Sequence, residues 1–241
     1  MTADAAPRLL DCGDTAISVD YGNAVDPALN ARVTALDRAL QAEPFPGLVE
    51  CVPSYRALMV HFDPLATDVA ALRTRLLALA AAPPVVAGPR RRWQVPVAYG
   101  GPHGADLDDI AAYASLSPAD FVEAHLAPVY TVMMIGFLPG FSYLGGLDPR
   151  LSRPRRKVPR PLIPASSISI GGDQTAVGSV AGPSGWHLIG RTPALPFAPG
   201  REPVFLFDAG DEIVFTPISP REWDNLSSRA AAGASVAVRV A

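Results

Sequence analysis

The second half of the chain constrains the fold most strongly, because from Val129 onward its strand-like segments are short and separated by turns. Glycine and proline supply these turns: the 241 residues include 26 Pro and 20 Gly, a combined share well above the usual ~12%. Many short strands joined by such turns favour a β-barrel or β-sandwich over a doubly wound sheet. We therefore predict a mainly β fold for this half.

The first half shows strand-like and helical periodicity in turn. Strand-like stretches cover residues 15–21, 48–52 and 56–62, and leucine and valine recur at helical spacing over 29–40 and 69–79. The order β-α-β-β-α predicts a small α+β domain.

A stretch rich in Gly, Pro and Arg at residues 82–93 has the composition of a short, stiff linker. We place the domain boundary near residue 88, which gives an α+β domain over 1–88 and a mainly β domain over 89–241. Within the second domain we expect two short helices, over 106–114 and 118–126.

Charge and composition exclude several classes of protein. The net charge of −3 gives no electrostatic case for binding nucleic acid or an anionic membrane. The chain has no basic-then-apolar signal segment and no run of ~18 apolar residues, so we expect a cytoplasmic protein. With two Cys, four His and no HExxH pattern, we expect neither a disulfide framework nor a metal site.

A basic segment at residues 150–160 carries six cations and no acid. Arginine recognises carboxylate and phosphate groups bidentately, and the interspersed prolines hold such a loop extended. One interpretation is that arginines of this segment, such as Arg155 and Arg160, contact a ligand or partner; the family resemblance described below favours it. The alternative is a solvated basic loop that contacts nothing.

Aromatic and polar side chains on glycine-rich turns complete the candidate binding residues. Phe137 and Tyr143 flank a Pro-Gly turn, and Gln174 and Thr175 follow Gly171-Gly172, where the backbone can approach a ligand closely. Trp186 is followed by Arg191, whose cation could meet a carboxylate. A hydrophobic turn at the barrel end, a β-bulge and a structural arginine are the corresponding alternatives.

His125 is the one candidate for general acid–base catalysis. The ordinary pKa of a histidine side chain lies near neutrality, and His125 matches a histidine of the family pattern described in the next paragraph. The alternative is a favourable interaction with the dipole of the helix that it ends. The chain contains no GxxxxGK[ST] loop, no GxGxxG after a strand and no GxSxG elbow. Any nucleotide would therefore be held in another way or by another chain.

Several spaced motifs resemble the family of bacterial 5-oxoprolinase B subunits, also described as the sporulation kinase inhibitor or allophanate hydrolase subunit 1 family. They are MIGFLPGFSYLGGL at 134–147, RPRRKVPR at 153–160, IGGDQT at 170–175, GWHLIGRTP at 185–193, WQVPVAYGG at 93–101 and AGDEIVFTP at 209–217. His125, Tyr130 to Val132 and, weakly, Val52 to Tyr55 extend the match. Because the motifs occur in the family's order, the resemblance covers most of the chain.

The resemblance implies a cyclophilin-like β-barrel for the second domain. It also implies a subunit of an ATP-dependent 5-oxoprolinase, a hydrolase that opens 5-oxo-L-proline to L-glutamate and is inactive or weak without its partner subunits A and C. ATP would be shared with, or bound by, a partner subunit. The substrate would lie at the barrel mouth, against the residues predicted above: Phe137, Tyr143, Arg155, Arg160, Gln174, Thr175, Trp186 and Arg191.

The sequence departs from the family pattern in one region. The family usually has AGSV where this chain has ASSI at 165–168, QTGIYP where it has QTAVGS at 174–179, and SPGGW where it has GPSGW at 182–186. These changes remove two hydroxyl groups, at Gly178 and Gly182, and a site that hydrogen-bonds its substrate discriminates strongly against altered partners. Either the ligand differs or the activity is reduced.

Two other functions are compatible with the same resemblance. One is a regulatory protein that binds a sensor histidine kinase and blocks its autophosphorylation. The other is a carboxyltransferase-like subunit that acts on urea or another amide with carboxybiotin, like the corresponding part of urea carboxylase.

Overall fold

The computed structural model describes residues 6–83 and 90–240, and the chain divides into two compact units, Met1–Gly88 and Pro89–Ala241. The centre of the predicted linker, residues 84–89, lies outside the described residues. Each unit has its own hydrophobic core.

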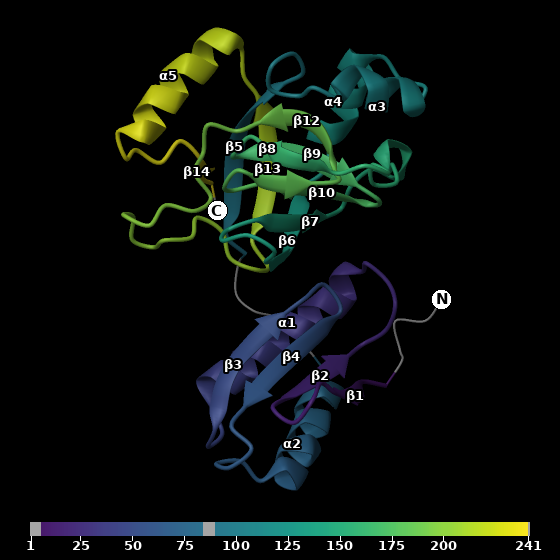
Figure 1. The fold of residues 1–241 in the computed structure, drawn as a ribbon, viewed down its shortest axis with the longest axis vertical. Coiled ribbons are helices and arrows are strands. Elements are labelled where there is room, and N and C mark those ends of the chain that lie inside the picture. The colour runs from purple at the N-terminus through teal and green to yellow at the C-terminus, as the bar shows by residue number, and fades with distance from the viewer. Residues whose placement is uncertain (1–5, 84–89, 241) are drawn as a thin grey trace. The chain divides into compact units, whose positions relative to one another are not determined.

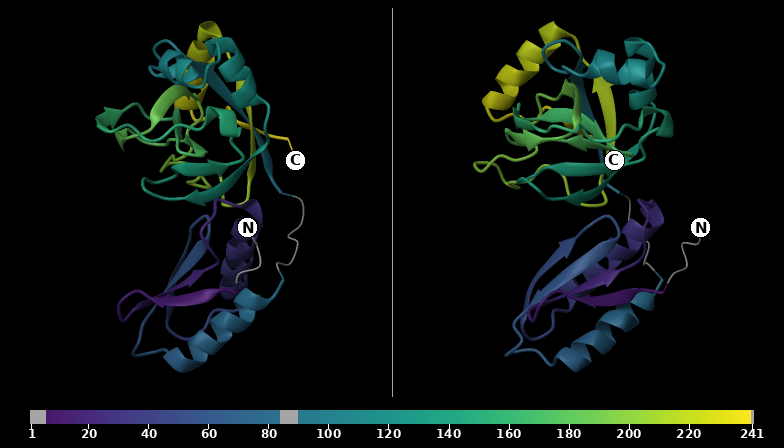
Figure 2. Two further views of the ribbon diagram at one scale, coloured as in Figure 1. Left: turned by 90° about the vertical axis from the view of Figure 1, so that its right-hand side faces the viewer. Right: turned by 45° about the vertical axis from the view of Figure 1, so that its right-hand side comes forward.

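The N-terminal unit is a four-stranded antiparallel sheet with two helices on one face (Figures 1 and 2). Its elements are β1 (Arg8–Asp11), β2 (Ala16–Asp20), α1 (Pro27–Ala42), β3 (Leu48–Pro53), β4 (Ala57–Phe62) and α2 (Val69–Ala81), with strand order β1-β2-β4-β3. Alternate residues of β2 and β4 face leucines of both helices. The predicted α+β character is confirmed, and the edge strand β1 is an addition to it.

The C-terminal unit contains a closed β-barrel. Its elements are β5 (Arg92–Tyr99), α3 (Leu107–Tyr113), α4 (Pro118–Leu126), β6 (Tyr130–Ile135), β7 (Ser142–Gly145), η1 (Pro149–Leu151), β8 (Arg160–Ile163), β9 (Ser167–Gly171), β10 (Gln174–Val177), β11 (Gly182–Ser184), β12 (His187–Arg191), β13 (Glu212–Pro217), α5 (Pro220–Ala231) and β14 (Val238–Arg239). The strand order β12-β9-β10-β7-β6-β13-β5 closes because β12 also pairs with β5. The prediction of a mainly β barrel is confirmed.

Local sequence signals account for the helices around the barrel. Ser117 caps α4 by accepting a hydrogen bond from the Asp120 N–H, and Pro118 occupies its first turn, as expected. Helix α5 was not predicted, although Ser219 and Glu222 form a capping box at its start. The barrel interior is filled by apolar side chains from all sides, including Val95, Leu144 and Ile168.

β8 and β11, which are separated in the chain by β9 and β10, form a separate two-stranded antiparallel sheet. It carries the end of the basic segment and, with the Gly136–Phe141 turn, forms the surroundings of the candidate site. None of the helices in residues 6–83 and 90–240 is long and apolar enough to cross a membrane.

Candidate functional site

An aromatic cluster lies on the outer surface of the barrel, over β7, β9 and β10. Phe141 and Trp186 are buried there against Ala176, with Tyr143 and Leu138 packed beside them. In β10, Thr175 and Val177 point into the barrel whereas Gln174 and Ala176 point outward, because side chains of a strand alternate. We call this surface, formed by Phe137, Phe141, Tyr143, Ala176 and Trp186, the aromatic face.

The rings of the aromatic face contact one another, edge to face in three pairs and tilted in the pair Phe141–Tyr143. The ring centroids of Phe141 lie 5.8 Å from Phe137, 4.8 Å from Tyr143 and 6.2 Å from Trp186, and those of Tyr143 and Trp186 are 5.7 Å apart. Such pairs stabilise each other beyond simple burial. The face is therefore a preformed apolar wall.

Glycine at position 171 lets Trp186 lie directly on β9. A Cβ built at Gly171 would be only 2.5 Å from an indole carbon of Trp186. The predicted role of the Gly-Gly pair was close approach of backbone to a ligand; what approaches Gly171 is the indole of Trp186.

Backbone hydrogen bonds hold the basic segment, residues 150–160, against the strands and turns that carry the aromatic face. Arg153 and Gly172 exchange two of them, with N···O distances of 3.3 and 2.7 Å, and the Arg156 N–H donates to the Gly185 carbonyl at 2.7 Å. Between these points His187 Nε2 donates to the Pro154 carbonyl at 2.9 Å. Arg155 thus lies between fixed neighbours.

Asp106, just before α3, neutralises two cations of the segment. Its carboxylate accepts hydrogen bonds from both terminal nitrogens of Arg160 at 2.7 and 2.8 Å, from Arg156 at 3.4 Å and from the Leu188 N–H at 2.7 Å. Burial would raise the pKa of Asp106, but these hydrogen bonds and the two positive charges outweigh it, so the pKa lies below its usual range.

Most of the arginines that the sequence suggested for anion binding therefore form ion pairs with carboxylates of the same chain. Arg160 is held by Asp106, Arg153 pairs with Asp109 at 2.8 Å, and Arg150 pairs with Asp148 at 2.6 Å. The sequence could not reveal the pairs with Asp106 and Asp109, because those acids lie more than 40 residues away along the chain. The structure thus does not present Arg160 as a free ligand contact.

Arg155 has a different environment. Its guanidinium lies over the indole of Trp186, 5.4 Å from the ring centroid, and the residue is exposed. Within residues 6–83 and 90–240 it forms no ion pair. Burial raises the pKa of Tyr143, and the positive charge of Arg155 partly opposes that shift, which places the two groups near each other.

Gln174 adds an unused polar group on the outward side of β10. The residue is buried, and its side-chain Nε2 has no hydrogen-bond partner in the described part of the chain. A buried amide nitrogen without an acceptor is unfavourable by about 1–3 kcal/mol. An acceptor on a bound molecule would relieve this cost.

Thr175 and His125 lie inside the barrel, away from the aromatic face. Thr175 Oγ1 donates to the Ser169 carbonyl at 3.1 Å and therefore accepts from His125 Nε2 at 3.0 Å. His125 Nδ1 then accepts from the Tyr99 hydroxyl at 2.9 Å.

Complete burial lowers the pKa of His125 to about 3, so the ring is neutral. Both of its nitrogens are occupied within the barrel interior. This geometry favours a structural role for His125 over proton transfer to a ligand, and it likewise makes Thr175 a partner of His125 rather than of a substrate.

Arg191 is separated from the aromatic face. It pairs with Ser167 at one end of β9, whereas Gln174 pairs with Gly171 at the other end, a strand length of about 13 Å. Its guanidinium lies 5.1 Å from the Trp223 ring centroid, and its Nε donates to the Ala165 carbonyl at 3.2 Å. The structure therefore does not bring Arg191 into one pocket with Gln174 and Trp186.

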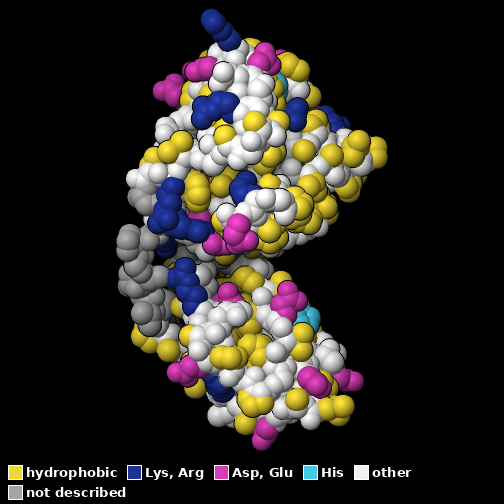
Figure 3. All heavy atoms as spheres, turned by 90° about the vertical axis from the view of Figure 1, so that its left-hand side faces the viewer, with side chains coloured by type: hydrophobic (Ala, Val, Ile, Leu, Met, Phe, Trp, Pro, Cys, Tyr) yellow, Lys and Arg dark blue, Asp and Glu magenta, His cyan; other side chains and the backbone are white. Residues whose placement is uncertain are grey.

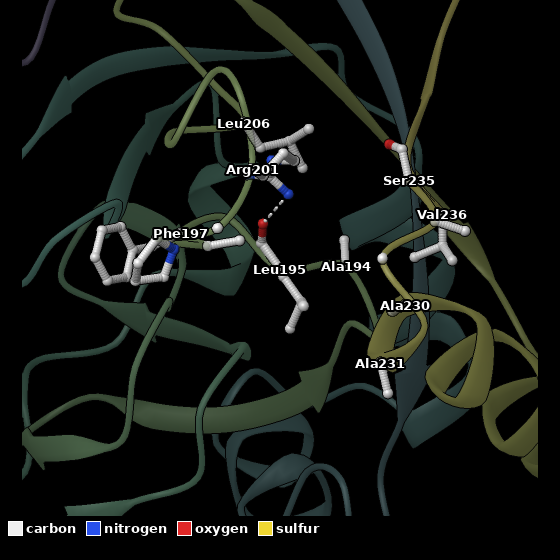
Figure 4. A pocket seen from close by; sticks show the side chains of 14 residues that line it. Ala194, Leu195, Phe197, Arg201, Leu206, Ala230, Ala231, Ser235 and Val236 are labelled. Carbon is white, nitrogen blue, oxygen red and sulfur yellow. Dashed lines mark hydrogen bonds between the residues drawn. The ribbon is translucent and has the colours of Figure 1, made fainter.

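A cavity of about 480 Å³ lies elsewhere in this unit, between the loop that follows β12 and the end of α5 (Figure 4). None of the predicted site residues lines it. No group of three or more His, Cys, Asp or Glu side chains that could hold a metal ion occurs in the described ranges.

Comparison with known sequences gives consistent matches. The family model described as "Carboxyltransferase domain, subdomain C and D" matches residues 7–207. The chain is 36% identical over 225 residues to the 5-oxoprolinase B subunit of Bacillus subtilis, covering 88% of this chain and 92% of that protein. It is 40% identical over 181 residues to the 5-oxoprolinase B subunit of Haemophilus influenzae, covering 75% and 84%.

Solved structures show the same fold. The crystal structure of TTHA0988 matches with a TM-score of 0.76 and 32% identity over 85% of this chain and 40% of that one. The urea amidolyase of K. lactis, at 18% identity, matches 97% of this chain and 16% of its own with a TM-score of 0.80. In both structures the matched region is part of a longer chain.

Proposed function

The chain belongs to the carboxyltransferase-domain family of subdomains C and D, and from this premise we propose that it is a subunit of an ATP-dependent 5-oxoprolinase. The complex would open the lactam of 5-oxo-L-proline to L-glutamate together with partner subunits A and C. The relatives named as 5-oxoprolinase B subunits, matched over most of their length, support this assignment. The word subunit in their names implies further chains.

One arrangement carries the proposal: the Arg155 guanidinium, which forms no ion pair within residues 6–83 and 90–240, lies over the indole of Trp186. That indole lies against Gly171, and the strand partner of Gly171 is Gln174, whose Nε2 has no hydrogen-bond partner in the same residues. A small cyclic amide that bears a carboxylate needs a cation, a flat apolar wall and a polar group. In our proposal Arg155 binds the carboxylate, the ring packs on the aromatic face, and Gln174 Nε2 donates to an oxygen of the substrate.

The reaction implied by the family divides the work between chains. The amide oxygen takes the γ-phosphoryl group of ATP, and ADP leaves. Water then attacks the activated carbon, the ring C–N bond breaks with the nitrogen leaving as the amine, and a second water hydrolyses the resulting acyl phosphate to the carboxylate and inorganic phosphate. We propose that this chain binds and orients the substrate, while ATP is held by a partner or shared with it. We assign no proton transfer to His125, because its ring is enclosed in the barrel.

Exposed apolar side chains beside the site provide a surface for a partner. Phe137, Val158 and Leu162 are 62%, 75% and 67% exposed, and Figure 3 shows hydrophobic side chains gathered on a projecting edge of the barrel unit. Such a patch on a soluble protein is typical of an interaction site. We propose that a partner subunit covers it and closes the substrate site.

The test is 5-oxoproline-dependent ADP release by the purified chain mixed with its partner subunits. Arg155→Ala is expected to lower kcat/KM about 10–100-fold, the loss of one charge-assisted contact. Arg150→Ala is the matched control, because Arg150 pairs locally with Asp148 on the surface. Equal activity of the two variants would remove the role given to Arg155, and no 5-oxoproline-dependent turnover at all would contradict the function.

A carboxyltransferase-like function is the second candidate, favoured by the family description and by the structural match to urea amidolyase. It would use carboxybiotin presented by a partner. Transfer of a carboxyl group to urea in the presence of a biotinylated carrier, without 5-oxoproline turnover, would favour this alternative.

A further inference from the structure

The cavity of about 480 Å³ in the C-terminal unit has the size of a small-molecule site. Figure 4 shows its two sides: the loop that follows β12 on one, and the end of α5 with the residues after it on the other. The lining residues of the loop are Ala194, Leu195, Phe197 to Arg201 and Leu206, and those opposite are Ala230, Ala231 and Gly233 to Val236.

Hydrogen bonds fix the loop side of the cavity. The Ala198 N–H donates to the Val204 carbonyl at 3.0 Å, and the Leu206 N–H donates to the Pro196 carbonyl at 2.9 Å. The rings of Phe197 and Phe205 lie 5.6 Å apart across the same loop. The loop is therefore an ordered hairpin.

The opposite side is fixed by the C-terminal cap of α5. The N–H groups of Gly233 and Ala234 donate to the carbonyls of Ala230 and Arg229 at 2.9 and 3.0 Å, and Gly233 has a φ of +89°. Small side chains along both walls, mostly alanines, leave the space between them empty. The cavity thus persists between two ordered walls.

One charged group, Arg201, lines this otherwise mostly apolar space. Its Nε, Nη1 and Nη2 donate to the carbonyls of Pro203, Leu195 and Val204 at 3.1, 2.8 and 3.2 Å. A guanidinium has five N–H groups, so these three bonds orient it and leave two donors.

No carboxylate in the described part of the chain pairs with Arg201. Burial lowers its pKa, as expected for a cation without a counter-charge. A bound anion would supply that charge, and a guanidinium suits a planar carboxylate.

We infer that this cavity binds a small monocarboxylate with an apolar body. The carboxylate accepts from Arg201, and the apolar part packs against the alanines and the side chains of Leu206 and Val236. The single cation and the apolar walls select one negative charge over the higher charge of phosphate. The site shares no residue with the aromatic face and is independent of the 5-oxoprolinase proposal.

Benzoate is the probe for this site, with benzamide as its neutral counterpart, in calorimetric or NMR titrations of the full chain. We expect benzoate to bind in the millimolar range, as small ligands do, and benzamide to bind about tenfold more weakly. Ala231→Leu adds side-chain volume to the cavity wall and leaves Arg201 in place. It should weaken the binding of benzoate at least about tenfold. Arg201→Gln should make benzoate and benzamide bind alike.

Arg229→Gln is the matched control, since Arg229 is an exposed arginine of α5 outside the lining. It should bind benzoate like the unmodified chain. Absence of benzoate binding, equal affinities for benzoate and benzamide, or unchanged affinity in Ala231→Leu would each overturn the inference. Because Ala231 is exposed at the end of the helix, this variant keeps the test valid if Arg201→Gln fails to fold.

Discussion

Replacing Asp106 by Asn should destabilise the C-terminal unit, because this one carboxylate holds the basic segment. The change removes the negative charge that faces Arg156 and Arg160 and presents N–H donors to them. Removing one partner of a buried ion pair typically costs about 3–5 kcal/mol. The arginine side chains are 32% and 27% exposed and can regain water, so we expect the lower end, about 3 kcal/mol.

The assay is chemical denaturation followed by circular dichroism, repeated over a range of pH. Because the folded-state pKa of Asp106 is lowered, its contribution to stability is full above the ordinary aspartate pKa of about 4 and is lost as the pH falls through the lower folded value. The difference between the unmodified chain and Asp106→Asn should therefore be constant near pH 7 and shrink below about pH 4.

Asp109→Asn is the control for this measurement. Asp109 pairs with Arg153, but the Asp109 side chain is 66% exposed. The free energy of unfolding should therefore fall by less than about 1 kcal/mol in Asp109→Asn. If Asp106→Asn cost no more than the control, or if its effect did not change in acid, the assignment of Asp106 as the anchor of the basic segment would be wrong.

Two further changes test the surroundings of the site. Gly171→Ala should displace Trp186, since the new Cβ would be 2.5 Å from the indole. We expect a shifted tryptophan fluorescence emission and a decrease of about 1–3 kcal/mol in the free energy of unfolding. Gly200→Ala, with open space around Gly200, should change neither quantity. Thr175→Val should cost about 1–3 kcal/mol by leaving the His125 N–H without an acceptor. Because the pKa of His125 is lowered to about 3, NMR titration should find its ring neutral from pH 8 to 5. The stability that the neutral ring contributes should be full above about pH 6.5 and decline below it. A titration midpoint of the His125 ring near pH 6.5 would contradict its burial in the barrel.

Local signals in the sequence predicted the elements well. The helices α3 and α4 lie within one residue of the expected 106–114 and 118–126, because capping residues and helical spacing are read within one segment. Helix α5 escaped notice because its end is an alanine-rich run, although a capping box starts it. The edge strand β1 is short and mostly exposed, so no alternation marks it.

The candidate site was harder to predict, because its chemistry depends on residues far apart in the sequence. Counting charges over 150–160 suggested an anion site, but Asp106 and Asp109 fold back onto that segment and leave Arg155 as the cation on the aromatic face. Arg191 is five residues after Trp186, yet it lies at the far end of β9 from Gln174. Proximity in the sequence did not predict proximity on the barrel.

A structure of the assembled complex with 5-oxo-L-proline tests the central claim most directly. Our account predicts the substrate carboxylate within hydrogen-bond distance of the Arg155 guanidinium, with the lactam ring against Trp186 and one of its oxygens near Gln174 Nε2. Substrate bound away from this chain, or at Arg191 on the other end of β9, would contradict it.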